Sequence, residues 1–217
     1  MTDHTDHDSF RIDLAPLIAD AASFDGWTDT AVTAAAEIAG VDPAAARFAF
    51  GGKAMTMITA WTQSIDAQML QMPGADTLTS LKIRDRIRTM IEFRLEAIAG
   101  REEALRRALI ELAKPGNLVA SAQLGWKSAD VMWRMAGDTA TDLNHYTKRA
   151  TLAAIYAATL SVMADDRSED HADTRAFLGR RIDGVMRFEK FKAQVLNPKG
   201  ERPSLVRLFG RLRYPAT

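Results

Sequence analysis

Polar side chains crowd into residues 137–150, a stretch that lies between two strongly apolar segments and reads GDTATDLNHYTKRA. Its candidate chemical groups are Asp142, His145 and Tyr146. Asp142 and His145 are three residues apart and could share a helix face, but two ligands are too few for a metal site. The stretch also lacks a nucleophile with a neighbouring base. These residue types therefore indicate recognition of a partner rather than catalysis.

The rest of the sequence offers no stronger catalytic arrangement. His4 and His7 lie in an acidic N-terminal stretch, and His171 lies in an acidic loop. The sequence has no Glu-x-x-His pair of the di-iron type, no phosphate-binding glycine loop and no serine-elbow pattern. It also has no Cys, which excludes disulfides, zinc-thiolate sites and a cysteine nucleophile. We therefore expect a protein that is not an enzyme, with no catalytic residues, no metal and no cofactor.

The elements that position residues 137–150 are predicted to be helices. Apolar residues recur at spacings of three and four, and no segment alternates convincingly with a period of two, so we expect an all-α fold. Asp42 is a suitable helix cap and Pro43 a favoured first helical residue. The expected helices cover residues 10–24, 28–40, 44–50, 53–72, 76–99, 101–114, 118–136, 142–164 and 173–196.

The order of these helices predicts four parts. We expect a disordered acidic tail over residues 1–9, a helix-turn-helix-like head over 10–52, a helical lipid-binding and dimerisation body over 53–197, and a linker with an amphipathic helix over 198–217. The 28 bases and 28 acids give no net charge, which argues against a surface built to attract nucleic acid. From residue 180 onward, ten bases outnumber three acids, as suits an anionic partner or membrane surface.

Two apolar segments, residues 118–136 and 150–164, are expected to be buried nearly all round. One interpretation is ordinary core with a helical dimer interface. The other is a lipid-sized cavity, because ten Met and four Trp supply flexible and bulky apolar side chains. The candidate lipid-binding residues are Trp126, Trp133, Tyr156 and Met163.

The pattern of residues 203–214 predicts a short cationic amphipathic helix. One face of this helix is apolar, and two arginines lie on the opposite face. Such a helix suits an anionic membrane interface, although it could instead fold back on its own bundle. The candidate membrane-binding residues are Leu205, Arg207, Leu208, Phe209, Arg211 and Leu212.

A three-helix head followed by a larger helical body resembles the TetR family of regulators, and residues 40–53 are similar to that family's turn and recognition helix. A DNA-reading helix needs donors for base edges and cations for phosphates. Here Arg47 and Lys53 are the only cations of the region, and alanine dominates it. We therefore expect a head that does not bind nucleic acid. A ligand-responsive transcription regulator is the alternative function.

Three motifs closely resemble the ubiquinone-biosynthesis protein Coq-nine family: GWT at residues 26–28, GDTATDLNHYTKRATLAAIY at 137–156 and FLGRRIDGVMRFEK at 177–190. The resemblance implies a TetR-like fold, commonly dimeric, that binds isoprenoid lipid without catalysing a step. It also implies that the protein assists the demethoxyubiquinone hydroxylase. The expected function is a non-catalytic accessory protein that presents isoprenoid quinone intermediates to that enzyme.

By this resemblance, the family's partner-docking patch maps onto Asp142, His145 and Tyr146. His145 departs from the pattern, since a Trp often precedes this Tyr in mitochondrial members. The family's membrane helix matches residues 204–213, which favours the membrane interpretation of that segment. The N-terminal residues resemble neither a signal peptide nor a transit peptide. We therefore expect a bacterial cytoplasmic protein, peripheral to the inner membrane.

Overall fold

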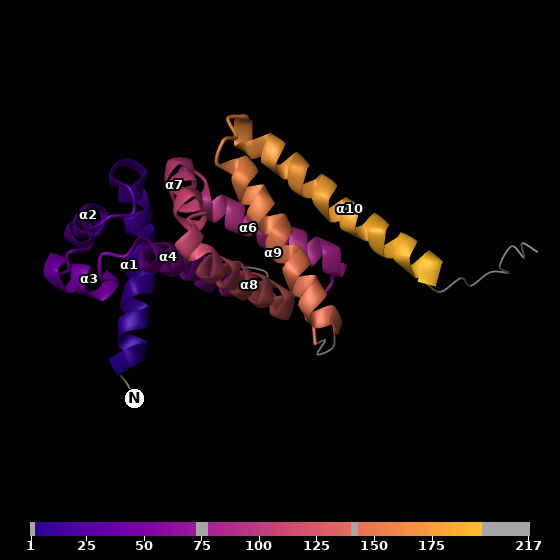
Figure 1. Ribbon diagram of the computed structural model, residues 1–217, viewed down its shortest axis with the longest axis horizontal. Helices are drawn as coiled ribbons and strands as arrows, with labels where there is room; N and C mark the ends of the chain where they lie inside the picture. Colours follow the sequence, from indigo (N-terminus) through magenta and orange to yellow (C-terminus); the bar gives the residue numbers. More distant parts are fainter. Residues whose placement is uncertain (1–2, 73–77, 140–142, 197–217) are drawn as a thin grey trace, which may run out of the picture. The chain divides into compact units, whose positions relative to one another are not determined.

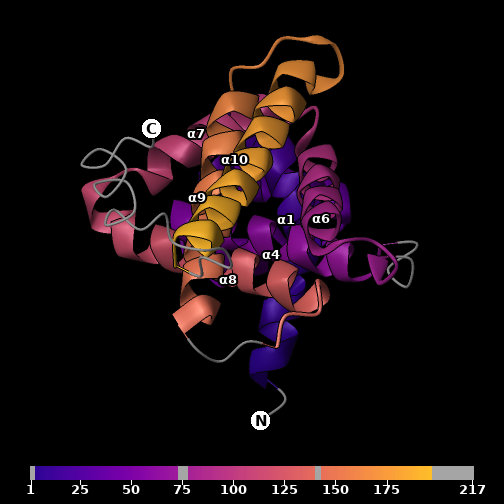
Figure 2. The same cartoon turned by 90° about the vertical axis from the view of Figure 1, so that its right-hand side faces the viewer.

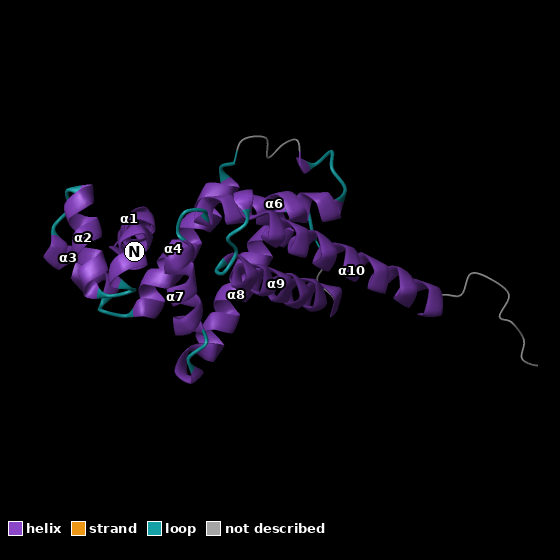
Figure 3. Ribbon diagram, turned by 90° about the horizontal axis from the view of Figure 1, so that it is seen from above, coloured by secondary structure: helices purple, strands orange, loops and turns teal. Residues whose placement is uncertain are grey.

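The structure is a computed structural model that describes residues 3–72, 78–139 and 143–196 (Figure 1). Over these residues the chain forms helices and loops without a strand (Figure 3), which confirms the predicted all-α class. The chain divides into two compact units, Met1–Gly179 and Arg180–Thr217. The described part of the second unit is helical, over residues 180–196.

Apart from the starts of α1 and α6, the helices begin and end close to the predicted positions. They span α1 Asp3–Asp25, α2 Asp29–Ala39, α3 Pro43–Phe50, α4 Ala54–Leu70, α6 Ile83–Ile98, α7 Glu102–Leu112, η1 Pro115–Asn117, α8 Leu118–Met135, α9 Leu143–Met163, η2 Glu169–His171 and α10 Ala172–Leu196.

Local capping explains the bounds of the head helices. The Asp42 side chain accepts hydrogen bonds from the backbone N–H groups of Ala44 and Ala45, at 3.1 and 3.2 Å, and so satisfies two donors at the start of α3. Gly40 and Gly51 end α2 and α3 at φ values of 69° and 58°, in the left-handed region that glycine adopts without strain. The sequence predicted these ends for the same reason.

Two helix starts differ from the predictions. α1 begins at Asp3 rather than Phe10, which differs from the expected disordered tail over residues 1–9. Acidic side chains in a first turn are favoured by the helix dipole, so the acidity of this stretch is compatible with a helix start. α6 begins at Ile83 rather than Asp76. The chain turns at Leu81, whose N–H donates to the carbonyl of Leu78 at 3.0 Å, and residues 73–77 lie outside the described residues.

Two tryptophans join the head to the body. Trp27 is buried at the start of the head's second helix, with its ring centroid 5.3 Å from that of Trp61 on α4. Its indole Nε1 donates to the carbonyl of Ala104 on α7 at 3.1 Å. α1 also packs against α4 and α7 as well as against α2. The predicted boundary at residue 52 therefore separates two parts that share a core.

α8 and α9 pack side by side in the body (Figures 1 and 2). The prediction that both helices are buried nearly all round is wrong. α8 buries Leu124, Ser128 and Met132, which are spaced by four residues and form one face, whereas Leu118 and Val119 are 55% and 73% exposed. α9 likewise buries one face and exposes alanines on the other. Alanine is apolar but small, so its presence indicates helix formation and does not by itself require burial.

Candidate partner-binding site

Arg149 ties the start of α9 to the end of α8. Its side chain is 2% exposed. Nε pairs with Asp130 Oδ1 at 2.6 Å, and Nη1 pairs with Asp138 Oδ2 at 3.0 Å. Burial lowers the pKa of Arg149, but the hydrogen bonds and charges of Asp130 and Asp138 more than offset this effect and raise it above its ordinary value. Arg149 therefore stays charged and fixes the orientation of the first turns of α9.

The aromatic cluster consists of Trp126 on α8 and His145 and Tyr146 on α9. The ring centroid of Trp126 lies 6.4 Å from that of His145 and 6.0 Å from that of Tyr146. The ring centroids of His145 and Tyr146 lie 5.1 Å apart. Tyr146 is 59% exposed, while Trp126 and His145 are half-buried. The cluster therefore presents a tyrosine ring to solvent over two supporting rings.

An exposed tyrosine supported by neighbouring rings is suited to anchor a protein interface, since aromatic residues carry much of the binding energy at such interfaces. His145 and Tyr146, two members of the predicted partner patch, lie in this cluster. The third ring belongs to Trp126, one of the candidate lipid-binding residues. No sequence signal could have placed Trp126 here, because it lies on another helix. Asp142, the third predicted member of the partner patch, lies outside the described residues.

The four candidate lipid-binding residues have different surroundings. Trp126 belongs to the aromatic cluster. Trp133 is half-buried, and its Nε1 donates to the carbonyl of Lys148 at 3.1 Å. Tyr156 and Met163 are buried in the body. Lipid binding by these residues therefore stays a prediction. The membrane-binding residues, from Leu205 to Leu212, lie outside the described residues.

The interior of the body holds a polar group that the sequence did not predict. This group, the Arg94 centre, consists of Arg94 on α6, Asp66 on α4, Ser128 on α8 and Tyr156 on α9. Arg94 is 0% exposed and forms an ion pair with Asp66. Burial lowers the pKa of Arg94, but Tyr156 and Asp66 outweigh this effect and raise it. Position 94 lies on the buried face of α6, so an arginine within an apolar helical pattern was the available signal.

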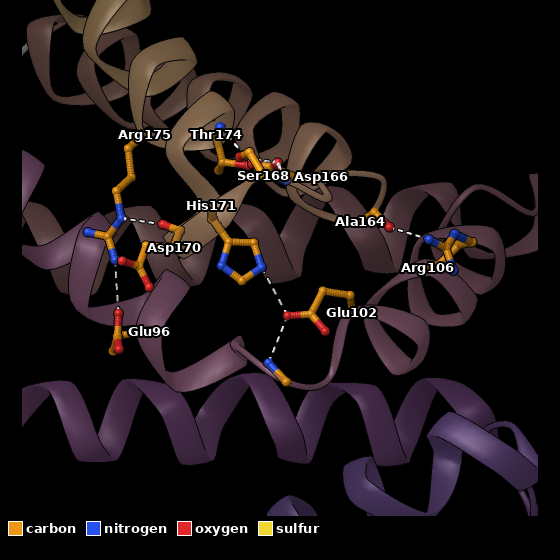
Figure 4. A network of polar contacts seen from close by, with 11 residues as sticks. Glu96, Glu102, Arg106, Ala164, Asp166, Ser168, Asp170, His171, Thr174 and Arg175 are labelled. Atoms are coloured by element: carbon orange, nitrogen blue, oxygen red, sulfur yellow. Dashed lines mark hydrogen bonds and ion pairs between the residues drawn. The ribbon is translucent and has the colours of Figure 1, made fainter.

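A second polar network holds the connection between α9 and α10 against the connection between α6 and α7 (Figure 4). Glu102 Oε1 accepts a hydrogen bond from the Gly100 N–H at 2.7 Å and lies 3.0 Å from His171 Nε2. Arg175 Nη2 pairs with Glu96 Oε2 at 3.0 Å. Burial raises the pKa of Glu102, but the backbone hydrogen bonds and His171 lower it by more. The network joins segments about 70 to 80 residues apart in the sequence.

Asp166 caps the start of α10 within this network (Figure 4). Its carboxylate accepts hydrogen bonds from the backbone N–H groups of Ser168 and Thr174, at 2.8 and 2.9 Å, and from both hydroxyls, each at 2.5 Å. Burial raises the pKa of Asp166, but these hydrogen bonds dominate and hold it well below its usual range. The role of Asp166 is therefore structural, and it requires the ionised form.

We expect Asp166→Asn to make the free energy of unfolding depend less on pH in the acid range. The folded-state pKa of Asp166 is depressed, so its stabilisation is present above the unfolded pKa of about 4 and is lost as the pH falls below that value. The variant should lose about 1 kcal/mol at neutral pH, as for other lost caps. Urea unfolding between pH 7 and pH 2.5 measures both effects. Equal pH slopes for both proteins would contradict the assignment, and Asp173→Asn serves as a neighbouring control.

In the described part of the chain, no three His, Asp or Glu side chains gather as metal ligands would. Among the helices described, none combines the length and the apolarity that a membrane span requires.

Sequence comparison matches part of this chain to a known family. Residues 118–189, which contain the aromatic cluster and Arg149, match the COQ9 family. The ubiquinone biosynthesis protein COQ9, mitochondrial, of Rattus norvegicus is 34% identical over 177 residues, covering 78% of this chain and 56% of the rat protein. Residues 118–189 form a COQ9-family domain. The human COQ9 protein is also 34% identical, with 78% of this chain and 55% of the human protein covered. The chain therefore spans about half the length of these relatives.

The fold of the chain is similar to that of a solved structure. The TetR transcriptional regulator from Nitrosomonas europaea ATCC 19718 superposes with a TM-score of 0.62 at 20% identity, covering 81% of this chain and 97% of that chain. At this identity the likeness concerns the fold alone. It confirms the predicted TetR-like fold.

The expected location in the bacterial cytoplasm, peripheral to the inner membrane, is wrong. The rat, human and Bos taurus relatives are all named mitochondrial proteins. The expectation relied on the acidic composition of the first residues. Because the chain spans about 55% of its relatives' length, those residues do not report on how a whole family member is targeted.

Proposed function

We propose that this chain is a non-catalytic lipid-binding accessory protein of ubiquinone biosynthesis, which presents isoprenoid quinone intermediates to the demethoxyubiquinone hydroxylase. The observation that carries the proposal is the exposed aromatic cluster, which lies within the segment that matches the COQ9 family. The relatives are named ubiquinone biosynthesis proteins, which supports involvement in that pathway. Their names also support a mitochondrial location.

We assign the docking of the hydroxylase to the aromatic cluster. Tyr146 supplies the exposed ring, which contacts the rings of Trp126 and His145. The ion pairs of Arg149 hold the helix that carries the cluster, so the surface is ordered before the partner arrives. A preorganised surface loses less conformational entropy on binding. Asp142 is included in the proposed patch from the family motif.

The presentation part of the proposal follows from the chemistry of the lipid. A polyprenyl quinone is nearly insoluble in water, so a protein must shield its chain while the ring reaches the hydroxylase. We assign the shielding to the body helices that carry Trp126, Trp133, Tyr156 and Met163. Dimerisation through the body and membrane contact through residues 203–214 complete the proposal, since the substrate resides in the bilayer.

We expect the purified protein to carry isoprenoid or acyl lipid. Organic extraction followed by mass spectrometry measures the lipid, and the molar ratio of lipid to protein should approach one per chain. An unrelated helical protein purified from the same cells controls for carry-over. Preparations that repeatedly contain no more lipid than the control would contradict the lipid-binding function.

The alternative is a ligand-responsive transcription regulator, and the Nitrosomonas europaea protein with a similar fold is named a transcriptional regulator. On α3, Arg47 and Phe48 are exposed, while Ala46, Ala49 and Phe50 are buried. One exposed cation beside an exposed phenyl ring is a poor surface for phosphates and base edges. Recovery of one palindromic site from genomic fragments at about 0.1 M salt would favour the regulator.

A further inference from the structure

Four body helices converge on a single guanidinium group at the Arg94 centre. Nη2 of Arg94 donates to Ser128 Oγ on α8 at 3.2 Å, and its Cζ lies 4.8 Å from the centroid of the Tyr156 ring on α9. Asp66 on α4 pairs with Nη1. Arg94 and Ser128 are at most 1% exposed, and the side chain of Asp66 is 14% exposed. The centre therefore places a compensated cation in the interior of the body.

One donor of this centre has no acceptor. Nε of Arg94 is buried and makes no hydrogen bond. Leaving a buried donor unsatisfied costs free energy comparable to a lost hydrogen bond, and such atoms are rare in native proteins. Arg88, six residues earlier on α6, also has an unsatisfied buried Nε, but its side chain is half-buried rather than enclosed. The interior of the body therefore offers one N–H donor to an acceptor that the protein does not supply.

The four helices of the Arg94 centre also carry buried methionines. A fully buried methionine lies one or two helical turns from each member of the Arg94 centre, on the same helix. Met side chains are flexible and polarisable, and they repack readily around ligands. These methionines are Met69 on α4, Met90 on α6, Met132 on α8 and Met163 on α9.

The charges of the Arg94 centre favour a neutral ligand over an anionic one. Asp66 already neutralises Arg94, so an anion would enter the interior without compensation, at a high desolvation cost. A neutral oxygen acceptor carries no such cost. We infer that the Arg94 centre binds the carbonyl oxygen of a neutral lipid-like ligand, such as a quinone ring, through Nε of Arg94. This inference rests on the proposed function and specifies where the polar head of the ligand is held.

The experiment compares two matched substitutions with two matched probes. Arg94→Lys keeps a cation for Asp66 but removes the Nε donor, and Arg88→Lys makes the same change at the other unsatisfied arginine of α6. Decyl-substituted ubiquinone supplies carbonyl oxygens, whereas decylbenzene supplies a ring and chain without oxygen. Delipidated proteins with equal helicity are titrated with each probe. Infrared spectra record the carbonyl stretch of the bound quinone.

Arg94→Lys should weaken binding of the quinone about 10-fold, the usual effect of losing a hydrogen bond to a charged group, and leave binding of decylbenzene unchanged. Arg88→Lys should change neither. The carbonyl stretch should lie at lower frequency in the wild-type protein than in an apolar solvent. A carbonyl stretch at the frequency seen in an apolar solvent overturns the inference, as does equal quinone affinity in all three proteins. If Arg94→Lys does not fold, the carbonyl stretch in the wild-type protein decides between the two outcomes.

The outcomes separate the inference from the proposed function. Wild-type protein that binds both probes equally, with no effect of Arg94→Lys, retains lipid binding and overturns the carbonyl site alone. Wild-type protein that binds neither probe and carries no native lipid overturns both. A quinone affinity that exceeds that of decylbenzene only when Arg94 is present supports both.

Discussion

Arg94→Met is expected to destabilise the protein by about 3–5 kcal/mol, the usual cost of removing one partner of a buried ion pair. The substitution leaves the Asp66 carboxylate, which is 14% exposed, without its cation. It also removes the hydrogen bond to Ser128 and the contact with the Tyr156 ring. For a chain of this size the melting temperature should fall by about 10 °C. Calorimetry and urea unfolding measure the change.

The double variant Arg94→Met/Asp66→Leu tests the cause. Replacing both members of a buried ion pair by apolar residues is often neutral, so the second substitution should restore most of the lost stability. If both variants were equally unstable, packing around Arg94 rather than the unpaired carboxylate would be responsible. A single variant within about 1 kcal/mol of wild type would contradict the burial of this pair.

Tyr146→Ala is expected to weaken association with the hydroxylase by ~2 kcal/mol, a roughly 30-fold loss of affinity. The ring is 59% exposed, so its removal should leave the free energy of unfolding nearly unchanged. Co-purification and titration of the two proteins measure the association, and cellular ubiquinone levels report the consequence. The physical reason is the loss of a large rigid ring at the centre of the proposed contact.

Two further variants make this test specific. Tyr146→Phe keeps the ring and should retain most of the affinity, since the aromatic area carries the contact. Phe48→Ala removes a ring that is 82% exposed on the head and should not affect the hydroxylase. Normal association and normal ubiquinone with folded Tyr146→Ala protein would show that the partner docks elsewhere.

The sequence determined the fold class and many of the helix ends. The three- and four-residue apolar spacing requires helices, and Asp42, Gly40 and Gly51 act within one turn of their own position. The family motifs predict a recognition site at His145 and Tyr146, whose ring centroids lie 5.1 Å apart. Such features are local or family-specific, so they can be read without knowing which helices become neighbours.

Only the tertiary structure decided which faces are buried and which distant residues meet. The alanine-rich faces of α8 and α9 look apolar in the sequence, yet the packing of the body leaves part of them exposed. Trp126 joins His145 and Tyr146 from another helix, and Asp66 reaches Arg94 across 28 positions of the chain. Helical periodicity specifies a face but not the partner of that face. The meeting of polar side chains from four helices at Arg94 therefore depends on how those helices pack.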